Sequence, residues 1–307
     1  RSIPSVFDGL KPSQRKIMYC SFKRNLTKKE IKVAQLSGYV SENGAYHHGE
    51  ASLQGTIVNL AQTFVGSNNI NLFDPVGQFG TRLQGGKDSG QPRYIMTKLT
   101  PLTQLLYNKT DNPLYKYLED DGMSVEPEYY LPIIPMILVN GCQGIGTGWS
   151  TDVPCYNPQD IISNIKCKIR GQSLQEMLPW YRGFTGSIEQ VTEKGVVKYI
   201  TRGVYKKVSD TSVEITELPI KVWTDKYKEH LEKLTIDSRK NKSKQYINSY
   251  KTYCTDTTVK FILKIPKLIL KNLMKEDTNG VPIFETVFKL RSKITITNMN
   301  LYDRDHK

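Results

Sequence analysis

The sequence lacks the features of a membrane protein. It has no run of about 18 apolar residues, the length that a membrane-spanning helix needs. It also has no basic amphipathic helix with the continuous apolar face that binds a membrane surface. We therefore expect a soluble chain without a membrane partner.

Cysteine and histidine are scarce. The five cysteines form no Cys-x-x-Cys pair and no ligand cluster with the four histidines. This disfavours a zinc site or a disulfide framework and fits a reducing compartment, so no metal site is predicted. Because Arg1 begins the sequence abruptly, without a signal peptide, we expect a piece of a longer polypeptide.

Positive charge is abundant by contrast. Lysine and arginine number 43 against 30 aspartates and glutamates, which gives a net charge of +13. A surplus of this kind attracts phosphate backbones and adds little to folding, so nucleic acid is the first candidate partner. The length of 307 residues is sufficient for two domains.

A glycine-rich loop over residues 85–91 leads to Arg93 and Tyr94 and then to a strand-like run. Tyrosine is a weak nucleophile at its usual pKa of about 10, so a catalytic tyrosine needs cations nearby. Arg93, Arg82 and Lys87 supply such cations in the sequence. The alternative is an exposed loop followed by a strand whose tyrosine simply packs.

Three helical segments precede this loop. The first begins at Pro12, the second covers about 32–40, and apolar spacing over 53–64 predicts the third. His47 and His48 lie at the N-terminal edge of the third helix, where amides and the helix dipole favour an anion. A buried structural histidine is the alternative. With the extended stretches 69–73 and 95–98, the pattern suits a winged helix whose wing carries the tyrosine.

The apolar block 129–139 is predicted to be a buried strand bounded by prolines, and residues 140–149 contain four glycines around Ile145. An isoleucine at an exposed loop tip suggests a wedge that enters a DNA base step. The alternative is a tight turn whose isoleucine folds back into the core.

A second domain is expected after a boundary near Pro154–Pro158. A helix should run from Asn157 to Gly171, and turn residues separate four strands at 187–191, 196–201, 204–208 and 212–216, typical of an antiparallel meander. A helix from Thr224, a strand over 260–265 and a closing run over 293–299 complete an α+β domain.

Several collinear segments together resemble one family. The sequence is similar to the DNA breakage-reunion region of type IIA DNA topoisomerases of the eukaryotic kind. The matching segments are 3–16, 32–36, 45–50 (AYHHGE), 59–70, 77–82, 85–88, 92–95 (PRYI), 144–149 (GIGTGW), 180–186 and 215–219 (ITELP).

The resemblance implies an α+β fold in three parts. These are a winged-helix DNA-binding domain over 1–153 with the catalytic tyrosine, a tower domain with an antiparallel sheet over 154–295, and the start of a coiled-coil arm over 296–307. The implied partners are double-stranded DNA and a second copy of the chain. The second copy is needed because each copy holds one catalytic tyrosine, whereas a double-strand break requires two.

The resemblance also implies residue roles. Tyr94 would attack a DNA phosphodiester and become linked to the 5′ phosphate, while Arg93 and His48 would stabilise the transition state. Ile145 matches the isoleucine that bends the gate DNA. Neighbouring phosphates would be clamped by basic residues. The predicted DNA-contacting residues are Arg1, Lys11, Arg15, His47, Arg82, Lys87 and Ile145.

Two cofactors are implied for the whole enzyme. No Glu and Asp-x-Asp-x-Asp cluster and no ATP-binding glycine loop occurs in the sequence. We therefore expect Mg²⁺ and ATP to be bound by upstream domains absent from this chain, and the chain alone to bind DNA but cleave it poorly. A cellular enzyme would be nuclear, and a viral one would act in the cytoplasm of the infected cell or reside in the virion.

Two competing functions stay open. A non-catalytic DNA-bending protein would keep the winged helix and the wedge but not the chemistry, and the Arg93–Tyr94 pair argues against it. A tyrosine recombinase fits poorly, because its scattered Arg-His-Arg arrangement is not recognisable around Tyr94.

Overall fold

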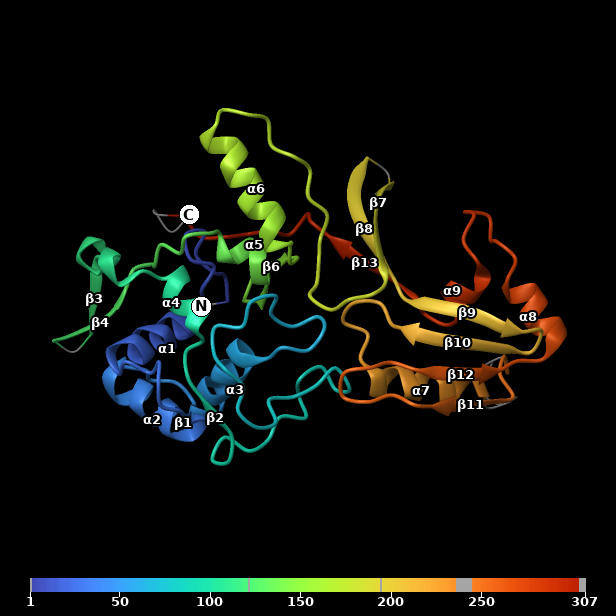
Figure 1. The fold of residues 1–307 in the computed structure, drawn as a ribbon, viewed down its shortest axis with the longest axis horizontal. Helices are drawn as coiled ribbons and strands as arrows, with labels where there is room; N and C mark the ends of the chain where they lie inside the picture. Colours follow the sequence, from blue (N-terminus) through green and yellow to red (C-terminus); the bar gives the residue numbers. More distant parts are fainter. Residues whose placement is uncertain (1, 121, 194, 236–244, 304–307) are drawn as a thin grey trace. The chain divides into compact units, whose positions relative to one another are not determined.

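The computed structural model describes all residues except 1, 121, 194, 236–244 and 304–307. The chain forms two compact units (Figure 1). Unit 1 comprises residues 1–80, 88–182 and 295–307, and unit 2 comprises residues 81–87 and 183–294. In this division the chain passes from unit 1 to unit 2 at 182/183, and the expected boundary at 153/154 lies within unit 1. Both units mix helices with antiparallel strands, in line with the expected α+β class.

Unit 1 is built on the three helices that the sequence predicts. They are α1 (Pro12–Lys23), α2 (Val33–Asn43) and α3 (Glu50–Ala61). Pro12 occupies the first turn of α1, where its missing N–H costs nothing. Leu53, Ile57 and Leu60 of α3 are buried in the core of this unit, as their spacing predicts. A two-residue strand ahead of α2, β1 (Ile31–Lys32), pairs with β2 (Met96–Thr97).

The segment after β2 carries short elements. These are α4 (Pro101–Leu106), the 3₁₀ helix η1 (Lys109–Leu114), the hairpin of β3 (Tyr117–Asp120) and β4 (Met123–Pro127), and α5 (Met136–Asn140). The strand predicted over 129–139 is wrong. Pro132 and Pro135 lack the N–H that a ladder needs, and Pro135 instead precedes the first turn of α5.

A second hairpin consists of β5 (Cys142–Ile145) and β6 (Ser150–Val153). The predicted helix α6 (Pro158–Ile169) follows, and the Asn157 side chain accepts a hydrogen bond from the Gln159 N–H at 2.9 Å, which caps its first turn. No helix occurs over the described residues 296–303, where a coiled-coil arm was expected to start. Instead, Tyr302 bonds to the backbone of Pro4 and Val6 in unit 1.

The described residues of unit 2 form two sheets. The three-stranded sheet has the order β13–β8–β7, and the four-stranded sheet has the order β11–β12–β10–β9. Its strands are β7 (Ser187–Glu193), β8 (Val196–Arg202), β9 (Val204–Ser209), β10 (Ser212–Glu217), β11 (Ser249–Thr252), β12 (Phe261–Lys264) and β13 (Arg291–Thr295), and its helices are α7 (Thr224–Thr235), α8 (Lys267–Leu273) and α9 (Ile283–Val287).

The four predicted strands of this unit are confirmed, but the single meander is wrong. β8 and β9 are consecutive in the chain, yet they belong to different sheets. Between them, the Gly203 N–H donates to the Leu290 carbonyl at 2.9 Å, and a Cβ on Gly203 would lie 2.4 Å from the Glu217 carbonyl oxygen. This close approach requires glycine and directs the chain from one sheet to the other.

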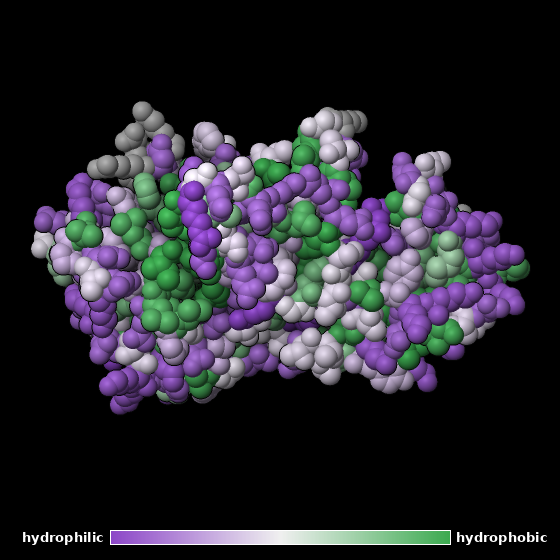
Figure 2. Space-filling model, turned by 45° about the horizontal axis from the view of Figure 1, so that its top comes forward, coloured by the Kyte–Doolittle hydropathy of each residue, from purple (hydrophilic) through white to green (hydrophobic). Residues whose placement is uncertain are grey.

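Figure 2 shows one face of the molecule, where hydrophilic side chains cover most of the surface. Exposed hydrophobic side chains are interspersed among the hydrophilic ones. Within the described parts of the chain, every helix is too short or too polar to cross a membrane.

Candidate nucleic-acid interface

Tyr94 is presented to solvent by a turn whose backbone is fixed on both sides. Its side chain is 71% exposed, which overturns the alternative of a packed tyrosine. The first amides of α2 hold the turn, because Val33 donates to the Ile95 carbonyl and Ala34 to the Pro92 carbonyl, both at 3.0 Å. Ile95 is buried and anchors the following strand. The phenol is therefore held on a rigid support while its hydroxyl stays accessible.

Arg93 lies directly beside this phenol. Its guanidinium carbon is 5.0 Å from the centroid of the Tyr94 ring, within the range of a cation–π contact. Arg93 is itself exposed. One cation and one phenol thus face solvent together, an arrangement that can bind a phosphate next to a nucleophile.

The histidine pair lines a cavity of about 370 Å³ at the start of α1. Both histidines are exposed, so the alternative of a buried structural histidine is wrong. His47 Nε2 is 3.6 Å from Asp120 Oδ2, and the His48 ring stands edge-on to Tyr46 at 5.3 Å. Arg93 and Tyr94 are not among the described residues that line this cavity.

Lys11 connects this cavity with the hairpin of β5 and β6. Lys11 lines the cavity, and its Nζ donates to the Gln143 carbonyl at 2.7 Å. Ser2 also lines the cavity, and its carbonyl lies so near Gly144 that any side chain there would collide with it. The predicted residues Lys11, His47 and His48 are therefore brought together beside the hairpin.

Ile145 ends strand β5 at the tip of this hairpin. Its side chain is 81% exposed, so the alternative of an isoleucine folded into the core is wrong. The tip is closed by a hydrogen bond of 2.8 Å from the Gly146 N–H to the Trp149 carbonyl, and the Trp149 side chain is also exposed. Two large apolar side chains thus project from one short rigid hairpin.

Ser2, Lys16 and Asp120 also line the cavity, and none of the three is among the DNA-contacting residues predicted from the sequence. Lys16 donates to the Glu126 carboxylate at 2.8 Å and to the Gly44 carbonyl at 2.7 Å, so its charge is largely neutralised. Its place next to Arg15 on the basic face of the helix that begins at Pro12 was the available signal. Nothing in the sequence places Ser2 or Asp120 here, because both arrive through tertiary folding.

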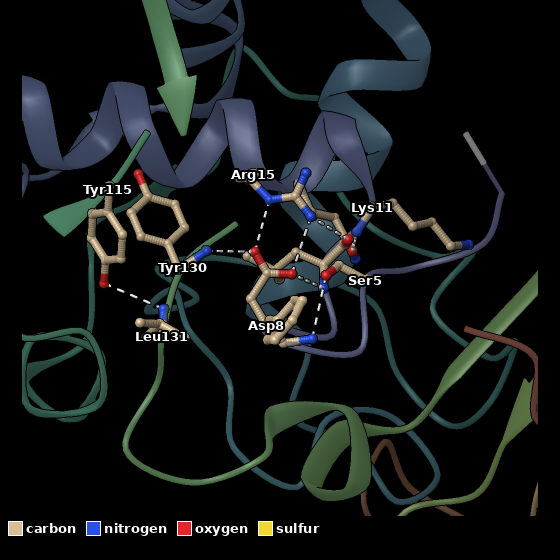
Figure 3. A network of polar contacts seen from close by, with 10 residues as sticks. Ser5, Asp8, Lys11, Arg15, Tyr115, Tyr130 and Leu131 are labelled. Atoms are coloured by element: carbon tan, nitrogen blue, oxygen red, sulfur yellow. Dashed lines mark hydrogen bonds and ion pairs between the residues drawn. The ribbon is translucent and has the colours of Figure 1, made fainter. Parts of the chain in front are cut away.

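Arg15 does not face solvent. Its Nε donates to Asp8 Oδ2 at 2.7 Å, and its Nη2 donates to Asp8 Oδ1 at 3.1 Å and to the Leu10 carbonyl at 2.9 Å (Figure 3). The two side chains are 8% and 0% exposed. The predicted phosphate clamp is thus corrected to a structural ion pair, because Arg15 is buried against an internal carboxylate.

Arg82 is also buried, in unit 2. Its Nη2 forms an ion pair with Glu217, whose other oxygen accepts a hydrogen bond of 3.0 Å from the Thr185 hydroxyl. Arg82 therefore stabilises the fold and is not a free cation for Tyr94. Lys87 is exposed at the end of the same segment. Arg1 lies outside the described residues.

Metal ligands are not clustered in the parts of the chain that the structure describes. No group of three or more His, Cys, Asp or Glu side chains there could hold a metal ion. The described residues therefore do not fit a Mg²⁺ site.

Comparisons with known proteins agree with this arrangement. The family model that describes the A subunits of DNA gyrase and topoisomerase IV matches residues 1–307. DNA topoisomerase 2 of Drosophila melanogaster is 50% identical over 307 residues, which cover all of this chain and 20% of that protein. DNA topoisomerase 2 of Plasmodium falciparum is 50% identical over 310 residues, covering all of this chain and 21% of that protein.

A solved structure is similar throughout. The crystal structure of the Plasmodium falciparum topoisomerase II DNA-binding, cleavage and re-ligation domain has a TM-score of 0.93 at 50% identity, over all of this chain and 40% of that one. The chain therefore belongs to the type IIA DNA topoisomerase family, and it matches the region represented by that family model. It spans about a fifth of the length of its curated relatives.

Proposed function

We propose that this chain is the DNA gate of a type II DNA topoisomerase and that Tyr94 is its nucleophile. The observation that carries the proposal is the 71% exposed phenol of Tyr94 beside the Arg93 guanidinium, on a turn held by the first amides of α2. Membership of the family supports it.

The proposed reaction is a transesterification. The Tyr94 oxygen attacks a DNA phosphorus and its proton passes to solvent. The bond from phosphorus to the 3′ oxygen breaks, and that oxygen takes up a proton from solvent and leaves as a 3′ hydroxyl. One phosphodiester replaces another of similar energy, so the reverse attack by the 3′ hydroxyl reseals the strand. Arg93 stabilises the charge that develops on the phosphate, and His48 donates a hydrogen bond to a non-bridging oxygen.

The hairpin of β5 and β6 serves in this proposal to bend the DNA. Ile145 enters a base step and partially unstacks it, as apolar wedges of DNA-bending proteins do. Lys11, Lys87 and His47 contact neighbouring phosphates, which positions the duplex without reading its sequence. The helical part of unit 1 would act as the winged-helix domain, and unit 2 as the tower domain.

The complete enzyme needs more than this chain. Type II topoisomerases in general use ATP and Mg²⁺, and we propose that regions outside this chain bind both. Each copy carries one Tyr94, so a double-strand break requires a homodimer. We expect the isolated chain to bind double-stranded DNA and to cleave it poorly.

The test is formation of a covalent adduct. The full polypeptide that contains this chain is incubated with labelled plasmid and magnesium and then denatured, and the wild type is compared with Tyr94→Phe. Tyr253→Phe is the matched control, because Tyr253 is another exposed tyrosine, 53% accessible. We expect wild type and control to carry the 5′ end of the DNA and Tyr94→Phe to carry none.

Two outcomes would contradict the proposal. An adduct that persists in Tyr94→Phe would show that another residue is the nucleophile. DNA binding and bending by wild type without any adduct would favour the non-catalytic DNA-bending protein.

A further inference from the structure

A second cavity of unit 1 is lined mainly by aromatic rings, and its described lining includes neither Tyr94 nor the histidine pair. Its volume is about 420 Å³, within the range of small-molecule sites, roughly 300–1,000 Å³. Its walls come from α1, η1, β3, β4 and the segments beside them. We call it the tyrosine pocket, and its aromatic residues are Tyr19, Phe22, Tyr107, Tyr115, Tyr117 and Tyr130.

Three rings of this pocket, those of Tyr107, Tyr115 and Tyr130, are held by contacts with one another and with the backbone. Tyr130 stands edge-on to Tyr115, with ring centroids 5.3 Å apart and planes at 85°, and edge-on to Tyr107 at 5.7 Å. The Tyr130 N–H donates to the buried carboxylate of Asp8 at 3.0 Å, and the Tyr115 hydroxyl accepts a hydrogen bond from Leu131 (Figure 3). The Asp8–Arg15 ion pair thus supports one wall of the pocket.

Charge in the pocket is positive. Lys23 and Lys109 are exposed members of the lining, and Lys23 Nζ lies 5.7 Å from the centroid of the Tyr19 ring. Among the described residues that line the pocket, none is acidic. Burial raises the pKa of Tyr19 and of Tyr117, so these hydroxyls stay neutral and do not repel an anion. The exposed amides of Asn108 and Asn112 add hydrogen-bonding groups.

We propose that the tyrosine pocket binds one unpaired nucleotide, with its base against the rings of Tyr19 and Tyr117 and its phosphate at Lys23 and Lys109. Aromatic walls with lysines at their edge are the combination that binds single-stranded nucleic acid, because every base has a face that stacks. A base within a duplex is already stacked and cannot enter a concave pocket. The nucleotide is supplied by a single strand or by a free mononucleotide.

The first measurement is fluorescence anisotropy of the 307-residue chain with labelled oligothymidylate of about eight nucleotides, a typical site size. Labelled duplex is measured in parallel at several salt concentrations. We expect Tyr117→Leu to weaken single-strand binding by at least about fivefold, the loss of one stacked base, and to leave duplex binding unchanged. Tyr253→Leu, at an exposed tyrosine of unit 2, is the matched control and should change neither.

The second measurement concerns the lysines. Lys23→Gln with Lys109→Gln should reduce the salt dependence of single-strand binding by about 0.7 per lysine in the log–log slope. Lys28→Gln with Lys29→Gln removes the same charge from exposed positions outside the pocket lining and should leave that slope unchanged. These four lysines are exposed, so the substitutions keep the chain folded, which circular dichroism verifies.

Competition with unlabelled thymidine monophosphate shows whether the bound nucleotide comes from a single strand or from a free mononucleotide. Displacement of the strand by the mononucleotide identifies a site for single nucleotides, whereas displacement by unlabelled oligothymidylate alone identifies a strand site. The proposal is overturned if folded Tyr117→Leu binds the strand as the wild type does, or if it loses strand and duplex binding in equal proportion.

Discussion

The carboxylate of Asp8 receives two hydrogen bonds from the guanidinium of Arg15, at 2.7 and 3.1 Å, in a site where both side chains are buried. Removing one partner of such a pair leaves the other charge without compensation. We expect Asp8→Asn to lower the free energy of unfolding of unit 1 by about 3 kcal/mol. Urea titration followed by near-ultraviolet circular dichroism measures it.

The double variant Asp8→Asn with Arg15→Met is the control for this effect. It removes both charges together, so it should be more stable than Asp8→Asn alone. Equal stability of the single and double variants would contradict an uncompensated charge as the cause.

Arg82→Met should act on the stability of unit 2, because Arg82 is buried against Glu217. We expect a loss of about 3 kcal/mol in the free energy of unfolding. Hydrogen exchange should accelerate at the Thr185 and Leu218 amides, which both donate to Glu217. Lys87→Met, at an exposed position, should change stability by less than about 0.5 kcal/mol. Normal stability of Arg82→Met combined with weakened DNA binding would return Arg82 to the DNA-contacting residues.

Gly85→Ala should destabilise unit 2 because the new Cβ would lie 2.4 Å from the Trp223 ring at a φ of +64°. We expect a cost of about 2–4 kcal/mol, the sum of overpacking and of left-handed backbone strain. Gly280→Ala separates the two causes. Gly280 also has a positive φ, +72°, but only Glu276 lies within 4 Å, so it should cost about 1–2 kcal/mol. Thermal unfolding of both variants gives the comparison, and equal costs would exclude the Trp223 contact as a cause.

Ile145→Ala should change DNA bending without changing stability. The side chain is 81% exposed, so the effect on the free energy of unfolding should be below about 0.5 kcal/mol. If Ile145 is the proposed wedge, energy transfer between dyes at the two ends of a bound duplex should report a smaller bend. Leu268→Ala, at a residue 77% exposed, should leave the bend unchanged. A normal bend with Ile145→Ala would remove Ile145 from the proposed interface.

His230 makes the stability of unit 2 depend on pH. Burial lowers the pKa of His230 below its usual value of about 6.5, and its Nε2 lies 2.9 Å from the Val287 carbonyl, to which the neutral ring donates. Below about pH 6.5, His230 takes up a proton in the unfolded chain but stays neutral in the folded chain until a lower pH. The free energy of unfolding therefore decreases as the pH falls from about 6.5. Above it, His230 contributes no pH dependence.

The matching variant is His230→Gln, whose amide can donate a hydrogen bond but does not titrate. We expect the unfolding midpoint of the wild type to decline more steeply between about pH 7 and 5 than that of the variant. Parallel pH profiles would rule out His230 as the titrating group.

Local patterns in the sequence predicted the local elements. The spacing of Leu53, Ile57 and Leu60 gave helix α3, and turn residues gave the four strands from β7 to β10. The grouping of those strands into two sheets was not predictable, because it depends on the contact of Gly203 with Glu217 and Leu290.

In the candidate site, too, local motifs were predictable from the sequence, whereas contacts between residues far apart in the sequence were not. The sequence predicted a loop that leads to Arg93 and Tyr94 and offered Ile145 at an exposed loop tip as one of two alternatives, and the exposure of both side chains in the structure decides between the alternatives. The burial of Arg82 was not predictable, because its partner Glu217 is 135 residues away in the sequence. From the sequence alone, an arginine in a basic chain cannot be told apart from a phosphate ligand. Only the fold shows that Arg82 is paired with the carboxylate of Glu217.

The short segment Thr81–Lys87 belongs to unit 2, although the chain on both sides of it belongs to unit 1. Neither unit is therefore a single stretch of polypeptide that can be produced by truncation. A piece ending at Arg182 would keep Tyr94 but would lack Glu217, the partner of Arg82, and Trp223, which packs against Gly85. Arg82 would then have no carboxylate partner from Glu217, twelve residues before the proposed nucleophile. Exchange of unit 2 for a related unit would therefore have to include this segment.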